Sequence, residues 1–138
     1  MSALSIRAQI NAKRDELRNL ENDAQSVQDQ LDALSGARKE LDLAEKELFT
    51  LIVKARRYPE MHNAWKGQRF NTYALSMEEQ TIESLQAYRL KLQEAIDEID
   101  TKMGELRNRK DDLSAAAIAC ASSISSLTRA LHAQSTTA

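Results

Sequence analysis

Two long heptad patterns, one in each half of the chain, constrain the fold of this sequence more than any other feature. The first runs from Ile6 to Ala55 and the second from Leu75 to Leu131, with apolar residues separated alternately by three and four positions. This spacing places apolar side chains along one side of an α-helix, and two such helices can bury that side against each other. The pattern predicts an all-α fold, an antiparallel two-helix coiled-coil hairpin.

The segment between the two patterns should contain the turn. Pro59 disfavours the α conformation in the residue before it, which predicts the end of the first helix near residue 57. We expect one elongated domain over residues 1–138: a helix over about 4–57, a turn over about 58–68, a second helix over about 69–132 and a short flexible C-terminal tail.

Two details of these helices are less determined by the pattern. Asn63 could cap an early second helix, whereas Ser76 with Glu79 forms a capping box for a later start, and the sequence does not decide between them. Gly36 and Gly104 lie inside the helices, where each should cost about 1 kcal/mol relative to alanine. Because the heptad phase continues through both glycines, we interpret them as local weak points or close-contact positions and not as helix ends.

Folding the chain at residues 64 to 66 predicts which seam positions face each other. No like charges meet across the seam in this register, and long charged side chains can lie along the apolar surface with their ends in water. The polar seam residues would face leucines, as Arg38 with Leu92, Arg89 with Leu41, Glu45 with Leu85 and Lys110 with Leu20.

Composition argues against several classes of protein. The net charge is −2 and acidic and basic residues alternate along both helices, so the basic stripe of a nucleic-acid-binding protein is missing. The N-terminus lacks the apolar run and cleavage site of a Sec signal peptide, and we expect no direct membrane insertion. The expected location is cytoplasmic.

The sequence also lacks the residue patterns of catalysis. His62 and His132 are far apart, Cys120 has no histidine at a useful spacing, and there is no glycine-rich phosphate loop or His-x-x-x-His pair. We expect a protein that is not an enzyme, with no cofactor and no metal. Cys120 lies on the seam, where it should serve as a small buried hydrophobe.

Trp65, the only tryptophan, forms a Trp-x-Gly motif with Gly67 near the sequence midpoint, and Phe70 follows three residues later. With long helices on both sides and Pro59-Glu60 shortly before the tryptophan, this arrangement resembles the WXG-type superfamily of type VII secretion, in particular its YwqH-like branch that accompanies LXG toxins. The resemblance implies a turn and export motif made of Trp65, Gly67 and Phe70. The alternative is that Trp65 only covers the exposed end of the seam.

The same resemblance implies a non-enzymatic adaptor, or targeting partner. Such a protein would bind the helical N-terminal domain of an LXG-type toxin, together with a second small helical partner protein, and help deliver the toxin to the type VII secretion machinery. The wider superfamily uses a tyrosine followed four residues later by an acid as an export signal, and no tyrosine here has that acid. A signal assembled together with partners, or one supplied by the toxin, would fit better, and this chain could then be co-exported with the toxin.

A partner surface is also expected from the residues alone. The segment Ser114–Ser126 is small and uncharged on all sides, and small residues let another helix approach closely. Near the turn, further apolar residues lie off the main seam. The alternative explanation is helix propensity with local packing. The residues predicted to bind a partner are Ala116, Ala119, Ile118, Ser123, Phe49 and Leu51.

Two other functions fit a helical hairpin. One is a structural coiled-coil stalk component of a type III secretion or flagellar export apparatus, which has a similar helix layout but needs no Trp-x-Gly turn. The other is a generic helical chaperone with no role in secretion. A neighbouring gene for a toxin-like protein would favour the adaptor, and a neighbouring rotary-type ATPase would favour the stalk.

Overall fold

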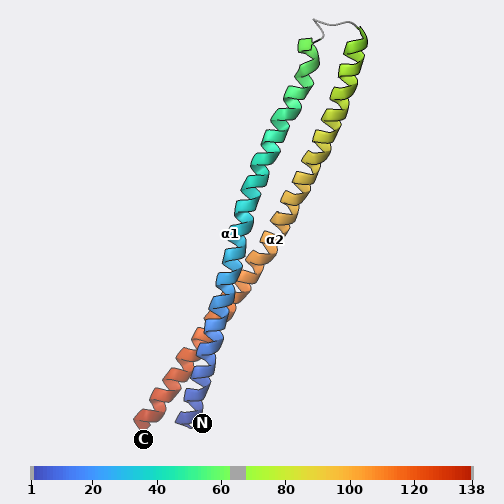
Figure 1. Ribbon diagram of the computed structural model, residues 1–138. Coiled ribbons are helices and arrows are strands. Elements are labelled where there is room, and N and C mark those ends of the chain that lie inside the picture. Colours follow the sequence, from blue (N-terminus) through green and yellow to red (C-terminus); the bar gives the residue numbers. More distant parts are fainter. Residues whose placement is uncertain (1, 63–67, 138) are drawn as a thin grey trace. The chain divides into compact units, whose positions relative to one another are not determined.

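Two α-helices make up the described part of the protein. The computed structural model describes residues 2–62 and 68–137, except for the side chains of 58–62, 68–75, 77, 78, 136 and 137. Helix α1 spans Ala3–His62 and helix α2 spans Gln68–Thr137, with no strand among these residues (Figure 1). The prediction of an all-α fold with two packed helices is therefore confirmed for this part of the chain.

Both helices begin within one residue of the predicted positions 4 and 69, whereas they end later than the predicted positions 57 and 132. Helix α1 starts after Ser2, whose hydroxyl accepts a hydrogen bond from the Ser5 backbone N–H at 3.1 Å, as an N-cap does. It continues through Pro59 to His62, because the bias against the α conformation before a proline is a preference that a formed helix can override. Helix α2 includes Ser76, so the later capping-box start is wrong.

The expected C-terminal tail after residue 132 is also corrected, because α2 runs to Thr137. Neither glycine nor proline follows Leu131, and the alanine and glutamine there favour a helix. Both helices also continue through Gly36 and Gly104. No described residue has a positive φ, and a Cβ added at either glycine would meet no atom within 4 Å. Within this chain the two glycines are thus weak points and not close contacts.

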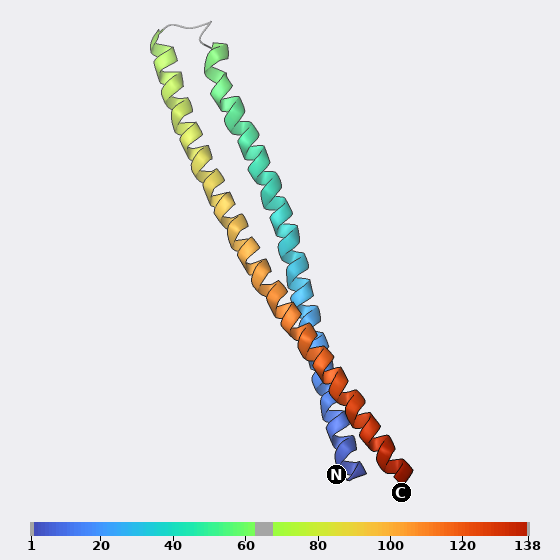
Figure 2. The same cartoon turned by 180° about the vertical axis from the view of Figure 1, so that it is seen from behind.

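Contacts divide the chain into two units, and each unit contains a stretch of both helices (Figures 1 and 2). Unit 1 consists of Met1–Ala33 with Met103–Ala138, and unit 2 consists of Leu34–Lys102.

The buried seam of unit 1 follows the predicted heptads. Its buried side chains are 2% to 7% exposed and come from both helices: Ile6, Ile10, Val27, Leu31, Met103, Leu106 and Cys120. Two polar contacts join the helices. The Lys110 ammonium donates to Gln28 Oε1 at 2.5 Å, and the Cys120 thiol donates to the Lys13 backbone carbonyl at 3.1 Å. Unit 1 is therefore held by an apolar seam with few charges across it.

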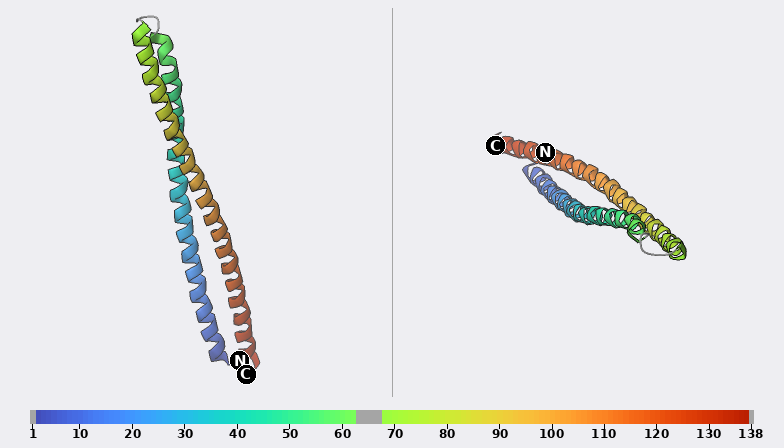
Figure 3. Two further views of the ribbon diagram at one scale, coloured as in Figure 1. Left: turned by 90° about the vertical axis from the view of Figure 1, so that its right-hand side faces the viewer. Right: turned by 90° about the horizontal axis from the view of Figure 1, so that it is seen from above.

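The described side chains of unit 2 include fewer buried residues. Leu48, Ile52 and Leu92 form its buried cluster, and Leu41, Ala44 and Leu85 pack against this cluster while partly exposed. The two segments of unit 2 lie side by side, as two further views show (Figure 3).

Ion pairs join the two helices of unit 2 along one side of this seam. Arg89 Nε donates to Glu45 Oε1 at 2.6 Å, and Arg38 Nε donates to Asp100 Oδ1 at the same distance. The hydrogen bond and the charge of Asp100 raise the pKa of Arg38 above its ordinary value. Because the earlier residue of α1 pairs with the later residue of α2, the segments are antiparallel.

The polar residues of the seam bind polar partners on the other helix. Arg38 binds Asp100, Arg89 binds Glu45 and Lys110 binds Gln28. Each partner lies one to two helical turns beyond the leucine that the sequence predicted to face it. Arginine and lysine side chains are long enough to reach that far, so their charged ends bind polar residues while their stems lie along the seam.

Candidate helix-binding surface

The predicted turn and export motif cannot be located in the structure. Trp65 and Gly67 lie outside the described residues, and Phe70 is placed in α2 only by its backbone. The other predicted site residues are all described, and they divide between the two units. Ala116, Ile118, Ala119 and Ser123 belong to unit 1, whereas Phe49 and Leu51 belong to unit 2.

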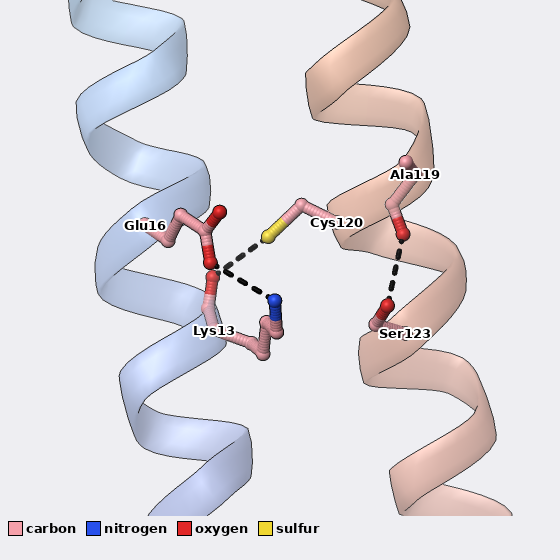
Figure 4. Close-up of polar contacts among 5 residues, drawn as sticks. All are labelled: Lys13, Glu16, Ala119, Cys120 and Ser123. Atoms are coloured by element: carbon pink, nitrogen blue, oxygen red, sulfur yellow. Dashed lines mark hydrogen bonds and ion pairs between the residues drawn. The ribbon is translucent and has the colours of Figure 1, made fainter.

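Three of the predicted residues form one surface in unit 1, here called the small-residue flank: Ala116, Ala119 and Ser123. The three side chains lie within about 60° of one another around the axis of α2, all on one side of the seam residue Cys120. Both alanines are exposed and Ser123 is half-buried. Cys120 points toward α1, whereas Ala119 and Ser123 lie along another side of α2 (Figure 4). This side of the helix is free for a second contact.

The hydroxyl of Ser123 makes the small-residue flank less polar than its sequence suggests. Its Oγ donates to the backbone carbonyl of Ala119, one turn earlier, at 3.1 Å (Figure 4). A hydroxyl that keeps this bond can be covered by a partner without losing its hydrogen bond, so the main cost of burying a polar group is avoided. The surface therefore presents methyl and methylene groups to a neighbour.

Ile118 does not belong to the small-residue flank. It is 72% exposed and lies about 100° or more around α2 from Ala116, Ala119 and Ser123. The four predicted residues of this segment therefore lie on two sides of α2. Helical spacing alone could have separated them, because two residues that are adjacent in sequence point in different directions on a helix.

Charges on α1 border the two sides of unit 1 differently. Glu16 and Asp23 are seven residues apart, so they occupy the same heptad position of α1. In an antiparallel pair this position faces the one that Ala116 and Ser123 occupy on α2, so both acids lie on the side of the small-residue flank. Glu16 pairs with Lys13 at 3.1 Å within its own helix. The opposite side carries Arg7 and Arg14. A helix on the small-residue flank would thus meet an acidic border.

The two predicted residues of unit 2 lie on opposite sides of its seam. Phe49 follows the buried Leu48 and Leu51 precedes the buried Ile52, so they emerge on different sides. The Phe49 ring lies under the Arg89 guanidinium, 4.8 Å from its centre, on the side of the ion pairs. Leu51 is 52% exposed on the other side. Phe49 and Leu51 therefore lie on different sides of unit 2.

The described part of the chain contains neither a metal-binding cluster nor a membrane-spanning stretch. No three or more His, Cys, Asp or Glu side chains there gather closely enough to hold a metal ion. Nor does either helix, over its described residues, contain a stretch long and apolar enough to cross a bilayer.

No family model matches this chain, and neither a curated protein nor a solved structure shows significant similarity to it. The arrangement of its own side chains is therefore the basis for a functional proposal.

Proposed function

We propose that this protein is a non-enzymatic adaptor that binds a helix of a partner protein along the small-residue flank of unit 1. The observation that carries the proposal is an uncharged ridge on α2, formed by the exposed Ala116 and Ala119 and the half-buried Ser123, beside a seam that is already closed by α1. A lone two-helix pair should be polar outside its seam. Small side chains at these positions let the backbone of a third helix approach closely, and no charge has to be desolvated.

The partner helix should match both the shape and the charge of this surface. It would present apolar or small residues to the ridge and basic residues to Glu16 and Asp23. Asp23 makes no ion pair among the described residues, so it is available to a partner. Exposed charges of this kind steer association and set orientation more than they raise affinity.

The more specific form of the proposal is a targeting partner for type VII secretion. Here the partner would be the helical N-terminal domain of an LXG-type toxin, with a second small helical protein in the complex, and the secretion machinery would recognise the Trp-x-Gly segment. The Trp65, Gly67 and Phe70 pattern between two long helices supports this form. The helix-binding function does not depend on it.

The binding surface can be tested with arginine substitutions on the native complex. Co-purification from the native host with mass spectrometry identifies the partner, and binding is then measured for Ala116→Arg and Ala119→Arg. Each guanidinium should weaken binding by about 2 kcal/mol or more through overpacking and desolvation. Ala121→Arg is the matched control, because Ala121 is an exposed alanine on the other side of the same helix. Equal binding by all three variants would contradict the proposed surface.

The secretion role needs a separate test at the turn. If the machinery recognises the motif, Trp65→Ala should abolish export of the cognate toxin while the complex still co-purifies. If Trp65 only packs on the hairpin end, the same change should lower stability by about 3 kcal/mol or more, and export should fall only as far as folding does. Melting temperature, complex recovery and toxin in the culture supernatant, measured on one variant, separate the two outcomes. Normal export from a stable Trp65→Ala variant would contradict the secretion role.

A further inference from the structure

The seam lacks buried side chains where each helix passes from one unit into the other. In α1 no side chain is buried between Leu31 and Leu48. In α2 the same holds between Leu92 and Met103, and the structure describes every side chain in both intervals. The two intervals, here called the thin stretch, are residues 32–47 of α1 and residues 93–102 of α2.

Both helix-interior glycines lie at this place. Gly36 is inside the thin stretch, and Gly104 comes just past its end in α2. Each follows, within one helical turn, the point where its helix changes unit, after Ala33 in α1 and after Lys102 in α2. A glycine lowers the population of the helical state about fivefold relative to alanine, and helices bend sharply at pairs such as Ser35-Gly36. Each helix therefore carries a weak helix former at the unit boundary.

Packing explains neither glycine, because an added Cβ would meet no atom within 4 Å at either position. The Arg38–Asp100 ion pair joins the helices within the thin stretch, but its side chains are 40% and 47% exposed, and exposed ion pairs add little stability.

The large apolar side chains on the seam of the thin stretch are only half-buried. They are Leu34, Leu41, Ile96 and Ile99. A segment with few buried apolar side chains opens at a lower free-energy cost than the rest of a fold. The thin stretch thus combines weak packing with weak helix formers.

We propose that the thin stretch together with Gly104 is a joint, at which both helices open locally and bend while the seams on either side of it stay closed. This proposal concerns motion and goes beyond the adaptor function. Three separate observations agree on the place of the joint: the lack of buried side chains in the fully described thin stretch, the two glycines, and the exposed ion pair. Such a joint would let a protein bound to unit 1 change its orientation without release.

Hydrogen exchange of the native full-length chain tests the local opening. Relative to their intrinsic rates, amide protons of the thin stretch should exchange at least about tenfold faster than those around Val27 and Leu48. Ile10→Ala, a core truncation far from the joint in sequence, should speed exchange around Val27 about tenfold or more and leave the joint amides unchanged. Equal protection throughout the wild type, or joint amides that follow those around Val27, would overturn the proposal.

Pairs of spin labels on α2 test the bend, with Cys120→Ala as the common background. Glu94→Cys with Ala115→Cys spans the joint, and Asn108→Cys with Arg129→Cys has the same spacing inside unit 1 as a matched control. All four labelled positions are exposed. In a straight helix each pair would be about 32 Å apart. The pair across the joint should show a distance distribution about twice as broad as the control pair.

Replacing the glycines should stiffen the joint. Gly36→Ala with Gly104→Ala should narrow the distribution across the joint to the width of the control pair, because alanine favours the helix at both positions. Equal widths before the replacement, or no narrowing after it, would overturn the proposal. The outcome is independent of the adaptor function, because no partner protein is present in either experiment.

Discussion

Unit 1 and unit 2 are built from the same heptad pattern and are held together differently. Unit 1 buries seven side chains along its seam among its described residues, and a lysine–glutamine and a thiol–carbonyl hydrogen bond join its helices. Unit 2 buries three among its described residues and joins its helices with two ion pairs, Arg38–Asp100 and Arg89–Glu45. The residues beside the seam thus decide how each unit is held and which side it leaves open to a partner.

Core truncation should show the largest effects. Leu106→Ala in unit 1 is expected to lower the free energy of unfolding by about 3 kcal/mol, and Leu48→Ala in unit 2 by about 2 kcal/mol, because the partly exposed neighbours of Leu48 can collapse into the gap. Urea unfolding followed by circular dichroism measures both. Leu90→Ala is the exposed control, with a change within about 0.5 kcal/mol. A larger loss for Leu48→Ala would break the comparison between the units.

Removing the half-buried ion pair should show that unit 2 depends on its polar side. In Arg89→Ala the Glu45 carboxylate, 17% exposed, loses its donor and the Phe49 ring loses its cover, so unfolding should become easier by about 1–2 kcal/mol. Lys46→Ala is the control, because its pair with Asp42 is exposed and should contribute less than about 0.5 kcal/mol. Equal losses of stability in the two variants would mean that the Arg89–Glu45 pair contributes no more than an exposed ion pair.

The two helix-interior glycines offer one stabilising change in each unit. Gly36→Ala in unit 2 and Gly104→Ala in unit 1 should each raise the free energy of unfolding by about 0.5–1 kcal/mol, because an added Cβ meets no atom within 4 Å and alanine favours the helix. Thermal and urea unfolding measure the gain. A loss of stability at one position would show that its unit departs from a regular helix there in solution.

The exposed pair Arg38–Asp100 should give the smallest effect. Asp100 raises the pKa of Arg38 through a hydrogen bond and its charge. The stabilisation that goes with a raised pKa is fully present at any pH below the ordinary pKa of arginine, and it is lost only as the pH rises through the raised pKa. This ion pair should therefore cause no pH dependence of stability near neutral pH. Arg38→Gln should change the melting temperature slightly in low salt and not at all in high salt. A large, salt-resistant loss would mean that the pair is shielded from water.

Much of the fold follows from the sequence, because burial of a continuous apolar stripe leaves a helix few alternatives. The buried positions of Ile6, Leu31 and Cys120 were predictable on this basis. The partners of the polar seam residues were not predictable, since a heptad pattern places a side chain on the seam without saying which residue its end reaches, as for Lys110 and Gln28.

The candidate site was likewise predictable only in part. Ala116, Ala119 and Ser123 share a surface that their spacing predicts. Phe49 and Leu51 were predicted from their places off the seam, and sequence proximity does not show that they emerge on different sides of the helix. The contact of Arg89 with Phe49 across the two helices required the register to be known.

The sequence separations of the cross-helix contacts affect the order in which the chain can assemble. Glu45 and Arg89 are 44 residues apart, whereas Lys13 and Cys120 are 107 apart, and closing the longer loop costs about 0.8 kcal/mol more. Refolding of the whole chain should therefore begin in unit 2. Protein synthesis adds a further delay. At roughly 5 to 20 residues per second, Cys120 is synthesised on the order of 5 to 20 seconds after Lys13. During that interval the apolar stripe of the N-terminal segment has no seam partner from its own chain, and another helix present at the ribosome could reach it first.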